Sequence, residues 1–368
     1  ALEDLLFGLK SLTVQNIIMF AIGGLLIYLA IEKEYEPMLL LPIGFGAILA
    51  NIPFSSAIGD EGFLTILFKS GILTELFPIL IFIAVGAMID FKPLLKQPFM
   101  LFFGAAAQFG IFFTMSLAAL FGFSLKEAAS IGIIGAADGP TSIYVATKFA
   151  KHLLAPISVA AYSYMALVPI IQPPIIKLLT TPSERRIKMK PKFDVSISRK
   201  VEILFPIVVT IIAGVIAPIS VALVGSLMFG NLVRVSGVLD RLSKAAQNEL
   251  ANIVTLLLGI TIGSTMTAEQ FLNPKTLLIL AMGLVAFMFD TAGGVIFAKI
   301  LNLFLKEKIN PMIGAAGISA FPMSARVIQK IAQKEDPSNF ILMQAVGANV
   351  AGQIGSIIAG SLILLLVK

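Results

Sequence analysis

Apolar residues fill most of the chain, in runs long enough to cross a lipid bilayer. A hydrocarbon core about 30 Å thick needs roughly 20 mostly apolar residues for each helical crossing. Runs of this kind predict an all-α polytopic membrane protein with about 10–12 transmembrane segments. The expected segments are Val14–Ile31, Glu36–Ile52, Leu73–Ile89, Pro98–Phe121, Ala128–Phe149, Pro156–Leu179, Val201–Ala217, Ile219–Val233, Ala251–Met266, Pro274–Phe304, Met312–Ile331 and Phe340–Val367.

A polar segment from Thr181 to Lys200 divides these apolar runs into two halves. It holds seven Lys/Arg and two acids, and short loops with such an excess of positive charge stay in the cytoplasm. We therefore expect a first membrane repeat over 1–180, a basic cytoplasmic linker over 181–200 and a second membrane repeat over 201–368. We do not expect so short a loop to bind nucleic acid. The first ten residues, ALEDLLFGLK, predict an amphipathic helix at the membrane interface and lack the pattern of a secretory signal.

Short matches between the two halves indicate an internal duplication. Asn51 precedes Asn231 by 180 residues, and Gly135–Ser142 (GAADGPTS) matches Gly317–Ser324 (GISAFPMS) at an offset of 182. Six spans in each half would make the repeats parallel, whereas a re-entrant segment or one misassigned span in each half would make them inverted. The loop charges leave both arrangements open.

The composition narrows the chemistry that the chain can perform. The apolar share is 58% and the charged share 13%, whereas about a quarter of a soluble globular chain is charged. Cysteine is absent and His152 is the single histidine, so thiol chemistry and histidine metal clusters are excluded. A metal bound here should be a hard cation held by oxygen atoms.

Two apolar spans contain residues that interrupt a helix. Pro140 removes a backbone hydrogen bond in IGIIGAADGPTSIYVA, and Pro322 does so in the matching GISAFPMSAR. Free backbone groups at such a break are tolerated in a membrane where protein or a water-filled cavity surrounds them, and there they can bind ions. Two broken helices in corresponding positions therefore predict a binding site near the membrane midplane.

Asp138 lies inside the first break, about ten residues from either end of its span. A carboxylate at the centre of a membrane helix costs at least roughly 2.5–3.5 kcal/mol. A Na⁺ ion bound by Asp138 with nearby hydroxyls or carbonyls would offset this cost, and so would protonation. The alternative is a structural carboxyl group that only caps the second half-helix, with Thr141 as its partner.

Arg326 follows the second break by four residues, with no acid close to it in its own span. Its planar guanidinium group suits a carboxylate. The candidates are a carboxylated substrate, Asp138 across the repeat interface, or water and lipid headgroups reached by extension of the side chain to the interface.

Other polar residues in apolar surroundings have structural explanations as well. Asp290 and Gln108 occupy equivalent places at the offset of 182, and interhelical hydrogen bonds would explain them as well as ion transit would. Tyr162 and Tyr164 could donate hydroxyl groups to a cavity or lie in an interfacial belt. His152 is interpreted as a solvated loop residue.

The sequence resembles a known family in the stretches GAADGPTSIY (Gly135–Tyr144), VAAYSYMALVPIIQPP (Val159–Pro174), LSKAAQNELANIVTLLLG (Leu242–Gly259), FDTAGG (Phe289–Gly294), GISAFPMSARV (Gly317–Val327) and GANVAGQIGS (Gly347–Ser356). Taken together, these stretches resemble the β subunit of the biotin-dependent sodium-pumping decarboxylases, the group that acts on oxaloacetate, methylmalonyl-CoA, glutaconyl-CoA or malonate. The likeness covers essentially the whole chain.

The resemblance implies a division of labour between subunits. A carboxyltransferase α subunit moves a carboxyl group to biotin on a carrier protein or domain, so the biotin is not attached to this chain. The carboxybiotin docks here and loses CO₂ in a step that consumes a proton, and this step drives Na⁺ out of the cell. A small membrane γ subunit and further copies of this β subunit are the other implied partners. The implied location is the bacterial or archaeal inner or plasma membrane.

The resemblance also implies roles for particular residues. Asp138 binds Na⁺, Tyr164 handles Na⁺ and protons, and Arg326 lies near carboxybiotin. The further implied Na⁺-site residues are Asn310, Gly314, Ser319 and, more weakly, Asn349. Inverted repeats with two crossed, broken helices, as in elevator-type transporters, are expected on this ground alone.

Two other functions remain open from the residues themselves. A stand-alone secondary transporter for Na⁺ with a carboxylate or a proton would use the same helix breaks. A purely structural membrane protein is the third possibility.

Overall fold

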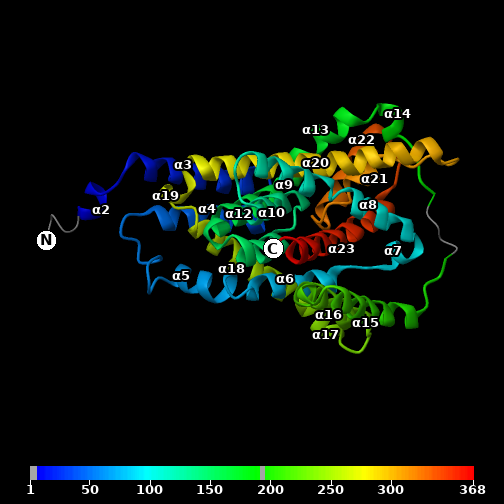
Figure 1. Ribbon diagram of the computed structural model, residues 1–368, viewed down its shortest axis with the longest axis horizontal. Helices are drawn as coiled ribbons and strands as arrows, with labels where there is room; N and C mark the ends of the chain where they lie inside the picture. Colours follow the sequence, from blue (N-terminus) through cyan, green and yellow to red (C-terminus); the bar gives the residue numbers. More distant parts are fainter. Residues whose placement is uncertain (1–5, 191–194) are drawn as a thin grey trace.

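The computed structural model describes residues 6–190 and 195–368, and these residues form helices and connecting turns without a β-strand. Residues 1–5 of the predicted interfacial helix and residues 191–194 of the linker lie outside the described residues. Figure 1 shows α20 along one side of an elongated molecule and α23 nearer its centre. The helices are α2 (Phe7–Lys10), α3 (Val14–Glu32), α4 (Pro37–Asn51), α5 (Phe63–Leu67), α6 (Leu76–Met88), α7 (Lys92–Lys96), α8 (Leu101–Ala106), α9 (Phe109–Leu120), α10 (Leu125–Gly132), α11 (Gly139–Phe149), α12 (Leu154–Ala166), α13 (Val168–Leu179), α14 (Pro182–Arg185), α15 (Arg199–Ile216), α16 (Val221–Val235), α17 (Asp240–Ala245), α18 (Ala251–Ser264), α19 (Ala268–Phe271), α20 (Pro274–Phe304), α21 (Met312–Ala315), α22 (Met323–Glu335) and α23 (Leu342–Leu366).

Fewer helices can cross a membrane than the hydrophobic pattern predicted. By length and composition the described residues contain six candidate spans, or up to eight if two bent helix pairs each count as one. The expectation of about 10–12 segments is therefore corrected. One reason is that α4 has only 15 residues, about 22 Å at 1.5 Å per residue. Another is that two expected spans turn back inside the protein. The six candidates are Val14–Glu32, Pro98–Leu120, Pro218–Val235, Asp240–Ser264, Pro274–Phe304 and Leu342–Leu366.

The first broken element, α10–α11, is a hairpin that returns to the side where it starts. If its helices continued in one direction, Phe149 would lie roughly 35 Å from Lys126 at 1.5 Å per residue. Instead the Lys126 ammonium group lies 5.8 Å from the centre of the Phe149 ring. Glu127 also accepts a 2.7 Å contact from His152, just after the element ends. The expected span Ala128–Phe149 is therefore a re-entrant segment.

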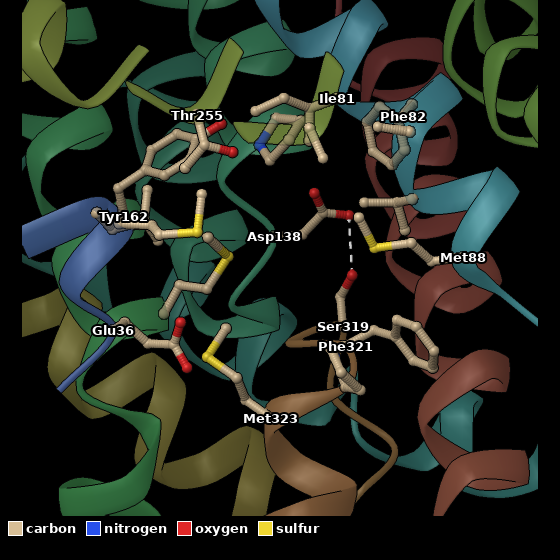
Figure 2. Close-up of a pocket in the computed structure, with 18 of the residues that line it drawn as sticks. Glu36, Ile81, Phe82, Met88, Asp138, Tyr162, Thr255, Ser319, Phe321 and Met323 are labelled. Carbon is tan, nitrogen blue, oxygen red and sulfur yellow. Dashed lines mark hydrogen bonds between the residues drawn. The ribbon is translucent and has the colours of Figure 1, made fainter. Parts of the chain in front are cut away.

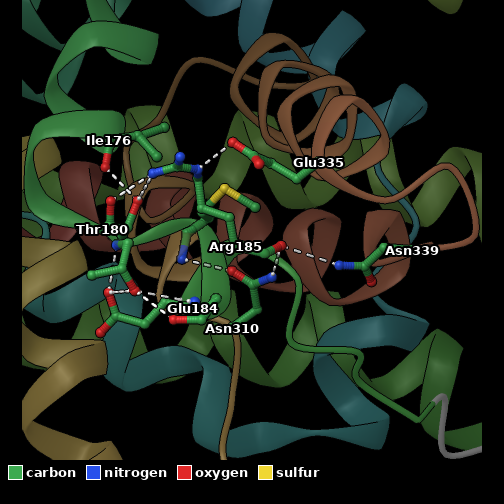
Figure 3. Close-up of polar contacts among 10 residues, drawn as sticks. Ile176, Thr180, Glu184, Arg185, Asn310, Glu335 and Asn339 are labelled. Atoms are coloured by element: carbon green, nitrogen blue, oxygen red, sulfur yellow. Dashed lines mark hydrogen bonds and ion pairs between the residues drawn. The ribbon is translucent and has the colours of Figure 1, made fainter.

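The second broken element, α21–α22, is also a hairpin, and its two ends are held by the start of the basic linker. The side-chain amide of Asn310 donates to the carbonyls of Arg185 and Ile187 at 2.9 and 3.0 Å. Asn339, beyond the other end of the hairpin, donates to the same two carbonyls at 3.2 and 3.3 Å (Figure 3). Arg185 in turn binds Glu335 at 2.7 Å. The expected span Met312–Ile331 is re-entrant as well.

The two hairpins open at opposite ends of α20. Lys275, in its first turn, lies 3.4 Å from Glu127 at the mouth of the first hairpin. Lys299, near its other end, lies 3.3 Å from Glu184 beside the second. With 31 residues, α20 is about 46 Å long. The hairpins therefore enter the protein from opposite faces and meet at their tips.

Two helix pairs outside the hairpins pack in the same way, each joining the two halves of the chain. In the pairs α4–α18 and α6–α16, glycines allow the backbones to touch, because a Cβ atom would overlap a carbonyl group of the partner helix. The side-chain amide of Asn51 donates to Met266 just after α18, and that of Asn231 donates to Ile89 just after α6. The close approaches are Gly46 to Ile260, Gly263 to Ile43, Gly86 to Leu227 and Gly230 to Ile83.

Candidate functional site

The tip of the first hairpin presents the carboxyl group of Asp138 to the protein interior. The helix ends through a 3₁₀ turn, and Ala137 takes a left-handed conformation with φ of 51°. Asp138 is then the N-cap of α11, and Pro140 lies in the first turn, where its missing N–H group costs no hydrogen bond. The Asp138 side chain accepts hydrogen bonds from the backbone N–H and hydroxyl of Thr141 at 3.1 and 2.7 Å. The capping role considered from the sequence is therefore real.

The tip of the second hairpin meets this carboxyl group directly. The Ser319 hydroxyl donates to Asp138 at 3.2 Å, and the Ser319 N–H donates to the Ala136 carbonyl at 2.9 Å. Gln353 of α23 donates to the Ser319 carbonyl. Asn349, one turn earlier, donates to the neighbouring Ile318 carbonyl at 2.7 Å. Capping alone does not require these contacts between two halves of the chain.

Ser356 of α23 completes the surroundings of Asp138. Its hydroxyl donates to the carboxyl group at 2.6 Å, so four hydrogen bonds in total converge on this side chain. Because Ser356 is the fifteenth of the 25 residues of α23, Asp138 lies close to the middle of a membrane-length helix. Asp138 is 3% exposed, so it is neither in bulk water nor against the acyl chains.

A cavity of about 270 Å³ lies next to the two hairpin tips. Asp138 and Ser319 face it from the tips, Tyr162 from α12, and Thr255 from α18, as Figure 2 shows. The Tyr162 hydroxyl is buried and has no hydrogen-bond partner among the described residues. Glu36 lies at another part of the wall. The cavity therefore combines an apolar lining with a few polar groups, as small-ligand sites do.

The structure does not bring every residue of the predicted set to Asp138. The Tyr164 hydroxyl donates to the Leu280 carbonyl, and Tyr162 rather than Tyr164 lines the cavity. The side-chain amide of Asn310 donates to the linker carbonyls of Arg185 and Ile187, and its oxygen accepts from the Met312 N–H at 3.1 Å. Asn310 therefore stabilises the mouth of the second hairpin and not its tip.

Gly314 allows close backbone packing and does not contact Asp138. Its Cα packs against the Gly294 carbonyl of α20, and a Cβ atom at either glycine would overlap the other backbone. Asn349 is fully buried beside the second tip, and its side-chain amide oxygen has no hydrogen-bond partner among the described residues. Because Asn349 bonds to Ile318, the residue before Ser319, this oxygen could bind a ligand near the tip.

Arg326 is exposed on α22 and makes no ion pair within 4.0 Å among the described residues. It does not contact Asp138, whose four hydrogen bonds come from other residues. The idea that Arg326 neutralises Asp138 is therefore wrong. The guanidinium group does lie close enough to Glu36 to lower the pKa of that acid, although burial, the larger effect, raises it.

Asp290 joins α20 to α9 by a hydrogen bond, and Gln108 bonds to the helix that precedes it. Asp290 is fully buried and accepts a 3.1 Å hydrogen bond from the backbone N–H of Ile111, in the first turn of α9. Gln108 donates to the Gly104 carbonyl at 2.8 Å, across the interruption between α8 and α9. These hydrogen bonds use one carboxyl oxygen of Asp290 and the amide nitrogen of Gln108. The other carboxyl oxygen of Asp290 and the amide oxygen of Gln108 are buried without a hydrogen-bond partner among the described residues.

The arrangement around Asp138 suits a small hard cation. One carboxyl group and the hydroxyls of Thr141, Ser319 and Ser356 are all oxygen donors, and a hydroxyl can turn its lone pairs toward an ion by rotation of its O–H bond. The described residues contain no group of three or more His, Cys, Asp or Glu that could hold a metal ion. A single negative charge among neutral oxygens favours a monovalent cation or a proton over a divalent metal.

Comparison with known proteins agrees with this chemistry. Residues 15–367 match the family model described as the Na⁺-transporting oxaloacetate decarboxylase beta subunit. The chain is 50% identical to the methylmalonyl-CoA decarboxylase subunit beta of Propionigenium modestum, with 97% of this chain and 96% of the relative covered. It is 51% identical to the glutaconyl-CoA decarboxylase subunit beta of Acidaminococcus fermentans, over 98% and 95% of the two chains. It is 45% identical to the oxaloacetate decarboxylase beta chain of Haemophilus ducreyi, over 97% and 96%. A match of this extent and identity places the chain, a multi-pass membrane protein, in the family of beta subunits of the sodium-pumping, biotin-dependent decarboxylases.

Proposed function

We propose that this chain decarboxylates carboxybiotin delivered by a partner's carrier domain and couples that step, with uptake of a proton, to the export of Na⁺. The observation that supports this most directly is the position of Asp138. It lies at the junction of two hairpins that enter from opposite faces, and it borders a cavity. An ion bound there would touch both halves of the protein at once.

In this proposal Na⁺ is bound by the Asp138 carboxylate together with the hydroxyls of Ser319 and Ser356. The Tyr162 hydroxyl and the Asn349 carbonyl oxygen lie within the same region and have no protein partner among the described residues. A cation at Asp138 neutralises the buried carboxylate, and a proton can replace it there. The proton consumed by decarboxylation and the exported Na⁺ would in this way compete for one negative charge.

Arg326 would bind the carboxylate of carboxybiotin at the cavity entrance. It is exposed, unpaired within the described chain and located one turn beyond the second hairpin tip. A carboxybiotin whose carboxylate leaves water for a poorly hydrated pocket loses CO₂ more readily. The chain needs no other chemistry on carbon, because the partner α subunit would form the carboxybiotin.

We further propose that residues 1–180 and 201–368 are inverted repeats of an elevator-like transporter, joined by a cytoplasmic linker over 181–200. The same close glycine packing occurs in the pairs α4–α18 and α6–α16, and each pair takes one helix from each half of the chain. This similarity supports a duplication. The opposite entry of the hairpins supports the inversion. A small γ subunit and further β subunits are the proposed membrane partners.

The test is decarboxylation of free carboxybiotin by the purified chain with its small membrane partner, with and without Na⁺. We expect the rate to depend on Na⁺ and to be lost in Asp138→Asn. Ser142→Ala is the matched control, because the Ser142 hydroxyl donates to the backbone carbonyl of Asp138 and not to its carboxyl group. Equal rates with and without Na⁺ would refute the proposal. Na⁺-driven uptake of a carboxylate into liposomes that hold this chain alone would favour the secondary transporter instead.

A further inference from the structure

The exposed side of α22, the second arm of the second hairpin, carries only positive charge. Among its 13 residues the exposed ones are Arg326, Lys330 and Lys334, each four residues from the next. We call these three residues the basic stripe. Residues at this spacing are neighbours on one side of a helix, and like charges there repel each other. Helix stability therefore does not explain the arrangement.

The acids next to the basic stripe are bound by other residues. Glu335, at the end of α22, pairs with Arg185 at 2.7 Å (Figure 3), and the following Asp336 pairs with Lys188 at 3.3 Å. Both bases belong to the start of the linker. The stripe itself makes no ion pair within 4.0 Å among the described residues. Its three positive charges are therefore available to a partner.

The basic stripe extends from the cavity to the face where the linker lies. Met323, the first residue of α22, lines the cavity, and Arg326 follows it by three residues. At the other end, Lys334 directly precedes Glu335, which the linker holds at the mouth of the hairpin. The eight residues from Arg326 to Lys334 span about 12 Å. A partner bound to the stripe from the linker side would therefore have the cavity entrance at one edge.

The exposed side of α22 is suited to water and not to lipid. Every apolar residue of α22 is buried. In contrast, α15 exposes Leu204, Ile211 and Val215 by 54, 60 and 78%. Helices that lie at a membrane surface combine basic side chains with exposed apolar ones that enter the lipid. The pattern on α22 therefore favours a soluble, negatively charged partner over lipid headgroups.

We propose that the basic stripe is the docking surface for an acidic face of the carrier domain that delivers carboxybiotin. This inference rests on the proposed function and goes further by naming the surface and the charge of its partner. Lys330 and Lys334 would contact acidic side chains of the carrier, while the carboxylate of carboxybiotin reaches Arg326 at the cavity entrance. Complementary charges of this kind raise the association rate more than the affinity.

The test is a titration of this chain and its small membrane partner with carboxylated carrier, followed by CO₂ release. It compares the double variant Lys330→Glu/Lys334→Glu with Lys177→Glu/Lys306→Glu, which changes the charge equally. Lys177 and Lys306 are exposed and lie outside the stripe, near the ends of α13 and α20, which are joined by a 2.8 Å hydrogen bond from Lys299 to Leu179.

We expect the stripe variant to lower kcat/KM for the carrier by about 10- to 10²-fold at low salt, within the range that electrostatic steering provides. Its kcat at saturating carrier should remain that of the wild type. Added salt should slow the wild type and the control variant more than the stripe variant, because salt screens the attraction that the variant has lost. Lys330→Arg/Lys334→Arg keeps the charge and should retain the wild-type kcat/KM.

Free carboxybiotin is the second substrate, and it separates docking of the carrier from binding of biotin. The stripe variant should lose much more activity with the carrier than with free carboxybiotin, which has no protein surface. Equal losses with both substrates would overturn the inference, and so would a wild-type kcat/KM for the carrier or an equal loss in the control variant. A loss seen in vesicles with anionic lipids but not in neutral detergent would assign the stripe to lipid headgroups instead. A wild-type protein whose decarboxylation of free carboxybiotin ignores Na⁺ would overturn the proposed function itself.

Discussion

Replacing Asp138 by asparagine separates its two roles, as a helix cap and as the charge that binds a cation. The Thr141 N–H needs an acceptor, so the asparagine oxygen should stay at that position and its NH₂ group should take the place of the oxygen that faces three hydroxyls. These hydroxyls can rotate to accept, and that of Ser356 already has a second acceptor in the Gln353 carbonyl at 3.2 Å. The side chain should therefore fit without a rearrangement of the backbone.

The energy terms nearly cancel when Na⁺ is absent. Three hydrogen bonds to a charged acceptor become neutral ones, which costs about 1 kcal/mol each, so about 3 kcal/mol in all. The variant no longer buries a charge, which removes a penalty of several kcal/mol. We expect Asp138→Asn to unfold in Na⁺-free buffer within about 2 kcal/mol of the wild type.

With Na⁺ the two proteins should differ. At 100 times its dissociation constant, a cation stabilises the folded protein by about 2.7 kcal/mol, and the variant should lose this gain. The assay is thermal unfolding in detergent during an NaCl titration at constant ionic strength, with choline chloride as the replacement salt and Ser142→Ala as the control. A full Na⁺-dependent shift in Asp138→Asn would show that the carboxylate only caps a helix.

Three further predictions follow from the same contacts. Ser356→Ala removes the 2.6 Å hydrogen bond to Asp138; we expect a loss of about 1.5–3 kcal/mol in unfolding free energy and weaker Na⁺ stabilisation, and an unchanged denaturation curve would contradict this. Tyr162→Phe should preserve stability but alter the Na⁺ dependence of CO₂ release, whereas Tyr164→Phe should cost about 1 kcal/mol and leave that dependence alone; equal kinetic effects would argue against a role for Tyr162. Although burial raises the pKa of Glu127, hydrogen bonds from His152 and Ser124 and the charge of Lys275 lower it to about 2. Because the folded pKa lies below the ordinary value of 4.5, the ionised carboxylate stabilises the fold fully above pH 4.5, and this stabilisation is lost as the pH falls toward 2. Glu127→Gln should therefore make the free energy of unfolding less dependent on pH in that window, and acid titration followed by circular dichroism measures this.

The sequence predicted the helix breaks well because their cause is local. Pro140 and Pro322 remove backbone hydrogen bonds wherever they stand, and the structure has interruptions at both. It left open whether the broken elements turn back. A run of apolar residues has the same hydropathy whether it crosses a membrane or forms a hairpin, and only contacts between its ends, such as Lys126 with Phe149, distinguish the two.

The site itself was predicted in part. Asp138 and Ser319 were both identified, but Ser356 was missed because it lies 218 residues from Asp138 in sequence. A signal was present: Asn349, Gln353 and Ser356 recur at a spacing of four and three residues on a largely apolar helix, which puts them on one face. Tyr162 and Tyr164 are two residues apart in a helix and point to different sides, so the sequence could not choose between them.

The meeting of two hairpin tips gives the buried acid a consequence that a single broken helix would lack. Ser319 contacts Asp138 with its side chain and Ala136 with its backbone N–H. A cation at the carboxylate would replace the direct hydrogen bond between the side chains of the two hairpins, and both hairpins would then bind the same ion. Each hairpin is anchored at its mouth, the first by Glu127 with His152 and Lys275, and the second by the linker. Because the mouths are fixed at opposite faces, ion binding can change the contact between the halves at the junction of the tips. Movement through a low-dielectric interior requires that this junction carry no net charge, and a bound cation provides this by neutralising the Asp138 carboxylate.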